Sequence, residues 1–142
     1  MPERLNSSSE RETEDIAYDL AARLKPGDII ALNGEMGAGK TAFVRGLARF
    51  LAPEARVSSP TFALVNQYGG YGGIYHFDMY RIDGEADLLS VGFFDYLGGG
   101  GEIIVIEWFG KIRQFFDGHT VEVDIIKSGG DNLREIIFER VK

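Results

Sequence analysis

The residues best suited to chemistry form one glycine-rich stretch, Gly34-Glu35-Met36-Gly37-Ala38-Gly39-Lys40-Thr41. It fits the pattern G-x-x-x-x-G-K-[ST] of a phosphate-binding P-loop. Glycines let the backbone turn its N–H groups toward phosphate oxygens, while a lysine ammonium neutralises the β- and γ-phosphate charge. The threonine hydroxyl is suited to Mg²⁺. The stretch therefore predicts a nucleoside triphosphate and Mg²⁺ as ligands.

The segments on either side are those that a P-loop requires. Asp28-Ile29-Ile30-Ala31-Leu32 is an apolar, β-branched run of buried-strand length that leads directly into the glycines. After the loop, apolar residues recur at helical spacing until Pro53, namely Val44, Leu47, Ala48 and Leu51. The phosphates are therefore expected at a helix N-terminus, where unpaired N–H groups and the helix dipole favour anions.

A P-loop also needs an acidic residue near Mg²⁺, usually at the end of a neighbouring apolar strand. Glu107 follows Ile103-Ile104-Val105-Ile106, which reads as a parallel strand covered on both faces. We therefore predict that Glu107 reaches the metal directly or through water, alongside Thr41. Lys40 and Glu107 are expected to be catalytic, together with Asp78.

Asp78 lies in a run whose alternation would place His76, Asp78 and Tyr80 on one face of a strand. Two interpretations stay open for Asp78: positioning of metal and water, or a structural pair with Arg81. For His76 a structural role is favoured over proton transfer, because phosphoryl transfer depends on positioning and charge more than on a base.

The remaining patterns predict a single α/β domain over residues 1–142, a P-loop NTPase with a mixed central sheet flanked by helices and hairpin additions. Ser9-Glu10-Arg11-Glu12 has capping-box spacing and begins a helix with an apolar stripe at Ile16, Leu20 and Leu24. The other expected elements are a loose hairpin over 62–68 and 74–81, a short helix over 83–89 and an antiparallel pair around 121–125 and 136–138.

Composition narrows the function. The 142 residues contain no cysteine, which excludes disulfides and thiolate metal sites. The chain shows no apolar segment of membrane-spanning length and no signal peptide, so we expect a cytoplasmic protein without a membrane partner. The net charge of −7 opposes unaided binding to a polyanion, so any nucleic acid is expected to be held by another molecule.

Several motifs together resemble the bacterial TsaE (YjeE) family, from about Ser9 to the C-terminus. These are the P-loop, Ser59-Pro60-Thr61-Phe62, His76-Phe77-Asp78-Met79-Tyr80-Arg81 and Ile106-Glu107-Trp108. The resemblance implies an ATPase that uses ATP and Mg²⁺ with TsaB and TsaD partners, which carry the tRNA. It acts in making threonylcarbamoyladenosine in tRNAs that read codons beginning with A, without itself transferring the threonylcarbamoyl group.

The resemblance also assigns residues. Lys40 and Thr41 match the phosphate and Mg²⁺ positions, Glu107 the second metal-side carboxylate, and Thr61 a switch-like threonine. Asp78 matches an aspartate of open role, and Trp108 an aromatic close to the nucleotide, although core packing explains a tryptophan there equally well. The expected nucleotide-binding residues are Gly34, Glu35, Met36, Gly37, Ala38, Gly39, Lys40, Thr41, Ala42 and Trp108.

Two departures from the family pattern stand out. Phe109-Gly110 replaces the usual Pro-Glu after Glu-Trp, and Ala42 replaces a second threonine but keeps its backbone N–H. Two segments could form a wall for the base, around 116–120 and 9–13, and neither has a sequence signal. The rival functions are an ATP-binding assembly module without turnover, a small-molecule kinase, and a GTPase, for which no Asn-Lys-x-Asp occurs.

Overall fold

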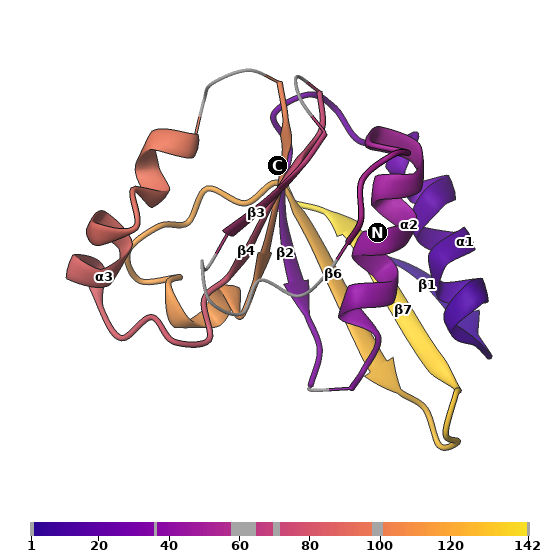
Figure 1. Cartoon of the computed structure of the whole chain (residues 1–142). Coiled ribbons are helices and arrows are strands. Elements are labelled where there is room, and N and C mark those ends of the chain that lie inside the picture. Colours follow the sequence, from indigo (N-terminus) through magenta and orange to yellow (C-terminus); the bar gives the residue numbers. More distant parts are fainter. Residues whose placement is uncertain (1, 36, 58–64, 70–71, 98–100, 142) are drawn as a thin grey trace.

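The structure is a computed structural model that describes residues 2–35, 37–57, 65–69, 72–97 and 101–141. A seven-stranded sheet runs through the molecule in the order β1-β7-β6-β2-β5-β4-β3 (Figure 1). The four central strands are parallel, and β7, β1 and β3 add antiparallel pairs at the two sides. The α/β fold with a mixed sheet and hairpin additions is therefore confirmed. The strands are β1 Glu3–Ser7, β2 Ile29–Asn33, β3 Val65–Tyr68, β4 Ile74–Asp78, β5 Ile103–Glu107, β6 Val121–Lys127 and β7 Arg134–Arg140.

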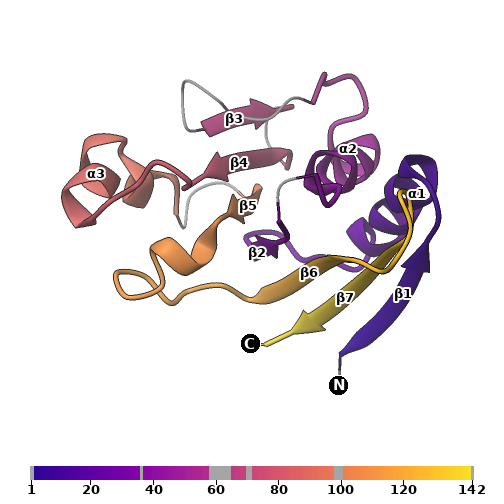
Figure 2. The same ribbon diagram turned by 90° about the horizontal axis from the view of Figure 1, so that it is seen from below.

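Two long helices cover one face of the sheet, and shorter helices cover the other (Figure 2). The first face carries α1 (Glu10–Ala21) and α2 (Lys40–Leu51), whose apolar stripes pack on the sheet. The second carries α3 (Glu85–Ser90) and the 3₁₀ helices η1 (Phe93–Tyr96) and η2 (Phe109–Lys111). The wholly buried β5 lies between the two cores, as its apolar sequence predicts. No helix in the described ranges is long and apolar enough to cross a membrane.

Helix α1 begins where its capping signal predicts. The Ser9 hydroxyl accepts a hydrogen bond from the Glu12 N–H at 3.0 Å, which satisfies one free donor of the first turn. The second bond of a capping box is shifted by one residue, because the Glu12 carboxylate accepts from the N–H of Ser8 instead of Ser9. Ser7 adds a bond from its hydroxyl to the Ser9 carbonyl at 2.8 Å. The start of α1 is thus held firmly beside β1.

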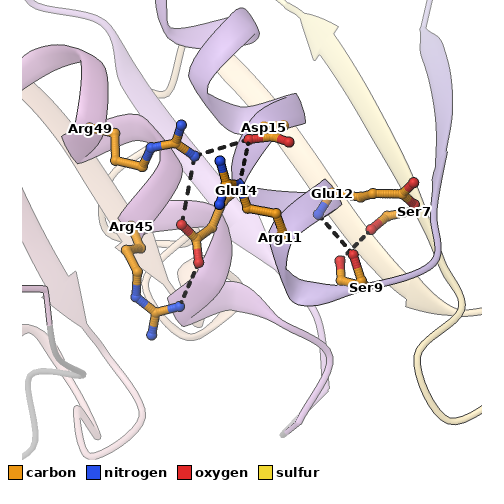
Figure 3. Close-up of polar contacts among 8 residues, drawn as sticks. All are labelled: Ser7, Ser9, Arg11, Glu12, Glu14, Asp15, Arg45 and Arg49. Atoms are coloured by element: carbon orange, nitrogen blue, oxygen red, sulfur yellow. Dashed lines mark hydrogen bonds and ion pairs between the residues drawn. The ribbon is translucent and has the colours of Figure 1, made fainter.

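Helices α1 and α2 pack closely because α2 has a glycine at their contact. A Cβ placed on Gly46 would lie 2.2 Å from the Glu14 carbonyl oxygen and 2.7 Å from the Ala17 Cβ. Ion pairs cross the same interface, as Figure 3 shows: Arg45 reaches Glu14 at 3.1 Å, and Arg49 reaches Asp15 at 3.1 Å. The position of α1 is therefore set by backbone proximity as well as by charge.

One strand was not predicted, and the predicted extent of another is wrong. Strand β1 was not expected, because Glu3–Ser7 has too short an alternation to indicate a strand; its backbone pairs with β7 and makes it an edge strand outside the β6–β7 pair. Strand β4 ends at Asp78, so Tyr80 lies in the following turn instead of on a strand face, and its side chain is half exposed. Residues 62–64 of the expected hairpin lie outside the described residues.

Candidate functional site

The P-loop joins the end of β2 to the start of α2, as its flanking sequence predicts. Gly37 has a φ of 81° and Gly39 a φ of 109°, both in the left-handed region that glycine adopts without a Cβ penalty. Gly39 is also the N-cap of α2, so the loop delivers the chain directly to a helix N-terminus. The stretch therefore needs glycine at these two positions because of the backbone conformation there.

A cavity of about 400 Å³ opens beside the loop and brings most of the predicted site residues together. Eight of them line it: Gly37, Gly39, Lys40, Thr41, Ala42, Asp78, Glu107 and Trp108. Glu10, from the 9–13 segment expected as a possible base wall, and Arg45 of α2, which was not among the predicted site residues, line it too.

Three other predicted loop residues lie outside this cavity. Gly34 and Glu35 line a neighbouring hollow on the other side of Trp108, and the Glu35 carboxylate lies 4.0 Å from Lys127. Ala38 is buried and lines a third hollow, beside Ser9. Met36 and the switch-like Thr61 lie outside the described residues.

The Lys40 ammonium is held at the centre of the site. It donates to the Gly34 carbonyl at 2.6 Å, lies 3.7 Å from a Glu107 carboxylate oxygen, and sits 4.7 Å from the centre of the Trp108 ring. Its side chain is only about a tenth exposed. These partners keep a buried cation satisfied, and a phosphate oxygen can replace the carbonyl as acceptor.

The two predicted carboxylates face each other across adjacent strands. Asp78 and Glu107 are register partners at the ends of the parallel strands β4 and β5, and β5 pairs directly with β2. Burial raises the pKa of Asp78, the Glu107 carboxylate adds to the rise, and a hydrogen bond from the Tyr80 N–H at 2.9 Å opposes it. Among the interactions of the described residues there is no pair between Asp78 and Arg81.

Glu107 is nearly fully buried, and its second oxygen is bound from behind. The His76 Nε2 lies 2.5 Å from that oxygen, and His76 has no exposed surface. His76 does not line the cavity. The ring therefore supports the carboxylate from the core side and does not face the space where a ligand would bind.

Trp108 both lines the cavity and packs into the second core, so both interpretations of this tryptophan apply. With φ 60° and ψ 38° it is the one non-glycine residue of the described chain with a positive φ. This left-handed conformation is costly for a bulky side chain, and strained residues of this kind cluster at functional sites. The Trp108 ring contacts the Lys40 ammonium and the Tyr80 ring, whose centre lies 5.1 Å from its own.

Arg134 is a loop contact that the sequence analysis missed. From the start of β7 it donates through Nε to the Ala38 carbonyl at 2.8 Å and through Nη2 to the Gly37 carbonyl at 3.1 Å. Because C=O and N–H point in opposite directions in a trans peptide, a fixed Ala38 carbonyl directs the Gly39 N–H away from Arg134. No local signal marks this residue, since it is almost a hundred positions away in the chain.

The donor set fits a magnesium ion accompanied by phosphate. The cavity lining carries three carboxylates, from Glu10, Asp78 and Glu107, against the cations of Lys40 and Arg45. A polyanion entering such a site needs an added cation. No cluster of three or more His, Cys, Asp or Glu able to hold a metal occurs in the described part of the chain. Mg²⁺ characteristically takes one or two protein oxygens and completes its shell with water and phosphate.

The start of α1 is the nearer of the two expected base walls. Ser9 and Thr13 line the hollow next to Ala38, and Glu10 lines the main cavity. Phe116, from the other segment, packs against the second core. The described cavities beside the P-loop contain no residue of 116–120.

These features define a single-domain α/β protein built around a P-loop, with a lysine, a threonine and two strand-end carboxylates at one cavity. The model of the family described as "Threonylcarbamoyl adenosine biosynthesis protein TsaE" matches residues 7–136. The chain therefore belongs to the TsaE family of tRNA threonylcarbamoyladenosine biosynthesis proteins.

Individual relatives agree with this assignment. The chain is 38% identical to the tRNA threonylcarbamoyladenosine biosynthesis protein TsaE of Bacillus subtilis, over 92% of this chain and 80% of the relative. It is 33% identical to the protein of the same name from Treponema pallidum, over 94% and 97%. Its structure resembles the crystal structure of Bacillus subtilis YdiB with a TM-score of 0.79 and 30% identity, covering 100% of this chain and 87% of that one.

Proposed function

We propose that this protein binds Mg·ATP at the P-loop cavity and hydrolyses it in support of tRNA threonylcarbamoyladenosine formation. The observation that carries the proposal is the convergence of Lys40 and Thr41 from the loop with Glu107 from β5 on one cavity. This is the arrangement in which P-loop proteins place phosphate and metal between a loop and a neighbouring strand end. The family assignment supplies the pathway.

Each side chain has a task that follows from its place. Lys40 exchanges the Gly34 carbonyl for the β- and γ-phosphate oxygens, and its position on the first turn of α2 adds the helix N-terminus to the anion site. Thr41 and Glu107 hold Mg²⁺, which when bound neutralises charge on the phosphates. Asp78, buried next to Glu107, orients the water that attacks the γ-phosphate in line.

Turnover by the isolated protein is expected to be slow. Arg45 is the arginine that lines the cavity within the described chain, and its guanidinium is already paired with Glu14 at 3.1 Å. A positive group that stabilises the transition state must then come from elsewhere, as with arginine residues supplied by partner proteins. TsaB-like and TsaD-like proteins fill that role in this proposal.

The tRNA is an indirect partner. A net charge of −7 gives no electrostatic attraction for a polyanion, and phosphate contacts each need a local cation. The partners therefore hold the tRNA and carry out the transfer, while this protein couples ATP hydrolysis to their cycle. An assembly module that binds ATP without turnover differs from this proposal only in phosphate release.

Nucleotide binding is tested by calorimetry on Lys40→Ala, with the exposed Lys25→Ala as the matched control. Removal of Lys40 should abolish most of the affinity for Mg·ATP, because it takes away a charge-assisted bond from a nearly buried site. Lys25→Ala should bind as the wild type does. An unchanged affinity of Lys40→Ala would refute the phosphate site.

Activity is tested by titrating TsaB-like and TsaD-like proteins into the wild-type protein while phosphate release is followed. The rate should rise with complex formation. Tight association without any phosphate release would favour the assembly module. Mass spectrometry of tRNA nucleosides after depletion of the protein should show less threonylcarbamoyladenosine, and an undiminished level would count against the pathway.

A further inference from the structure

A row of polar side chains runs beneath α2 from the edge of the sheet to the cavity. The Asn66 amide lies 3.2 Å from the Tyr68 hydroxyl, which lies 3.4 Å from the His76 Nδ1. The His76 Nε2 lies 2.5 Å from Glu107. Tyr68, His76 and Glu107 are all at most 5% exposed, so the contacts among these three side chains are shielded from water. The row consists of side-chain contacts that run from β3 through β4 to β5, in addition to the backbone pairing of these strands.

The chemistry of the side chains fixes the direction of two of these bonds. A carboxylate only accepts, so the His76 Nε2–H donates to Glu107. The Asn66 amide N–H donates to the Tyr68 oxygen. The His76 Nδ1, on the other side of the ring, is within hydrogen-bond distance of the Tyr68 hydroxyl, which can donate or accept. Three side chains from β3 and β4 thus form a row that ends on Glu107.

The row acts on one oxygen of Glu107 and leaves the other for the site. His76 binds Oε2, whereas Oε1 is the oxygen that lies 3.7 Å from Lys40. A carboxylate fixed by one oxygen has a defined orientation for the other, and the partners of metal-binding carboxylates act in this way. A histidine needed only for packing has no requirement for a carboxylate partner, because backbone groups satisfy ring nitrogens equally well.

We propose that His76 is a positioning residue that orients Glu107 toward the metal of the bound nucleotide, with Tyr68 fixing the ring. The inference rests on the proposed role of Glu107 at Mg²⁺. It assigns no direct contact between His76 and substrate. It extends the working site from the P-loop to the edge strand β3, which contributes no residue to the lining of the main cavity.

The test compares nucleotide affinity with and without Mg²⁺, and the ratio of the two dissociation constants is the readout. His76→Leu removes the donor, and we expect the ratio to fall about tenfold, the lower end of the effect of such partners on metal affinity. His76→Gln keeps an N–H near the position of Nε2 and should restore most of the ratio. Mg²⁺-free nucleotide affinity should stay close to wild type in both.

A matched control separates positioning from loss of packing. Ile74 lies on the same strand and the same face, is fully buried, and has a hydrocarbon side chain. Ile74→Val should destabilise the fold slightly, because it removes one buried methyl group, and it should leave the Mg²⁺ ratio unchanged. A merely structural role of His76 would make His76→Leu behave in the same way.

The outcomes are distinct. A wild-type ratio in His76→Leu overturns the inference and leaves the proposed function intact. A wild-type protein without Mg²⁺-dependent nucleotide binding overturns both. If His76→Leu does not fold, Tyr68→Phe decides, because it removes a single hydroxyl from the row. A fall in the ratio below the wild-type value supports the positioning role, and an unchanged ratio overturns it.

Discussion

The contact between α1 and α2 depends on a single missing methyl group at Gly46. In Gly46→Ala the new Cβ would lie 2.2 Å from the Glu14 carbonyl oxygen, whereas carbon and oxygen ordinarily approach to about 3.3 Å. The obstacle is backbone, which cannot rotate away as a side chain can. The two helices must therefore separate by about 1 Å along their contact.

The cost can be worked from the size of that contact. Each helix has 12 residues and is about 18 Å long, so a gap of 1 Å over a strip about 8 Å wide opens about 150 Å³. At about 24 cal/mol per Å³ this amounts to about 3.5 kcal/mol if nothing relaxes. Alanine returns about 1 kcal/mol through its higher helix propensity. We expect a net loss of about 2 to 3 kcal/mol, within the usual range for overpacking.

Urea denaturation and thermal melting, both followed by circular dichroism, measure this loss. The melting temperature should fall by about 5 to 10 °C in a chain of this size. Gly110→Ala is the control, because Gly110 also lies in a helical element and its added Cβ meets nothing within 4 Å. The control should change the free energy of unfolding by less than about 0.5 kcal/mol. A change just as small for Gly46→Ala would refute the close contact between the helices.

Three further predictions concern the loop, a carboxylate and a cap. Arg134→Met should weaken Mg·ATP binding about tenfold in calorimetry, because two bonds that order the P-loop are lost; Arg4→Met, which removes an exposed pair with Glu135, should not. Asp78→Asn should raise the free energy of unfolding of the ligand-free protein at pH 7. The raised pKa of Asp78 means that its ionised form destabilises the fold. The wild-type protein therefore loses stability as pH rises through the folded pKa of Asp78, and the asparagine variant does not. Urea titrations should show the gain vanishing below the ordinary value of 3.8, and a gain that persists there would contradict the reasoning. Ser9→Ala should cost about 1 kcal/mol in the same assay, through loss of the N-cap of α1; an unchanged midpoint would show that Ser8 or Ser7 compensates.

Much of the fold could be predicted because its signals are local. The strand before the P-loop, the helix after it and the buried β5 each have a periodicity that reflects burial on one or both faces. Strand β1 could not be predicted, because its short, half-polar sequence becomes a strand only through hydrogen bonds to β7. The end of β4 was misplaced for a similar reason: the turn at Tyr80 depends on the Asp78 carboxylate and not on a breaker residue.

The candidate site also contains residues that a local sequence signal predicts and residues that it does not. Lys40, Thr41 and Glu107 were expected at the site because loop and strand ends meet at one edge of a parallel sheet, and all three line the cavity. Arg45 was not expected to line it, no sequence signal favoured the 9–13 segment that contributes Glu10, and Arg134 was not expected to hold the loop. These contacts depend on how α1 and the β6–β7 hairpin are placed around the loop, and no spacing in the sequence encodes that placement.

The sequence by itself determined the chemistry of this protein: a P-loop with glycines where the backbone takes a positive φ, a lysine and a threonine at the helix start, and an acid at the end of a buried strand. Those are local requirements of backbone conformation and burial, so residue types and short spacings express them. Only the tertiary structure decided what supports them. His76 behind Glu107 and Arg134 on the loop carbonyls are contacts between distant segments, created when the sheet forms and desolvates the partners together.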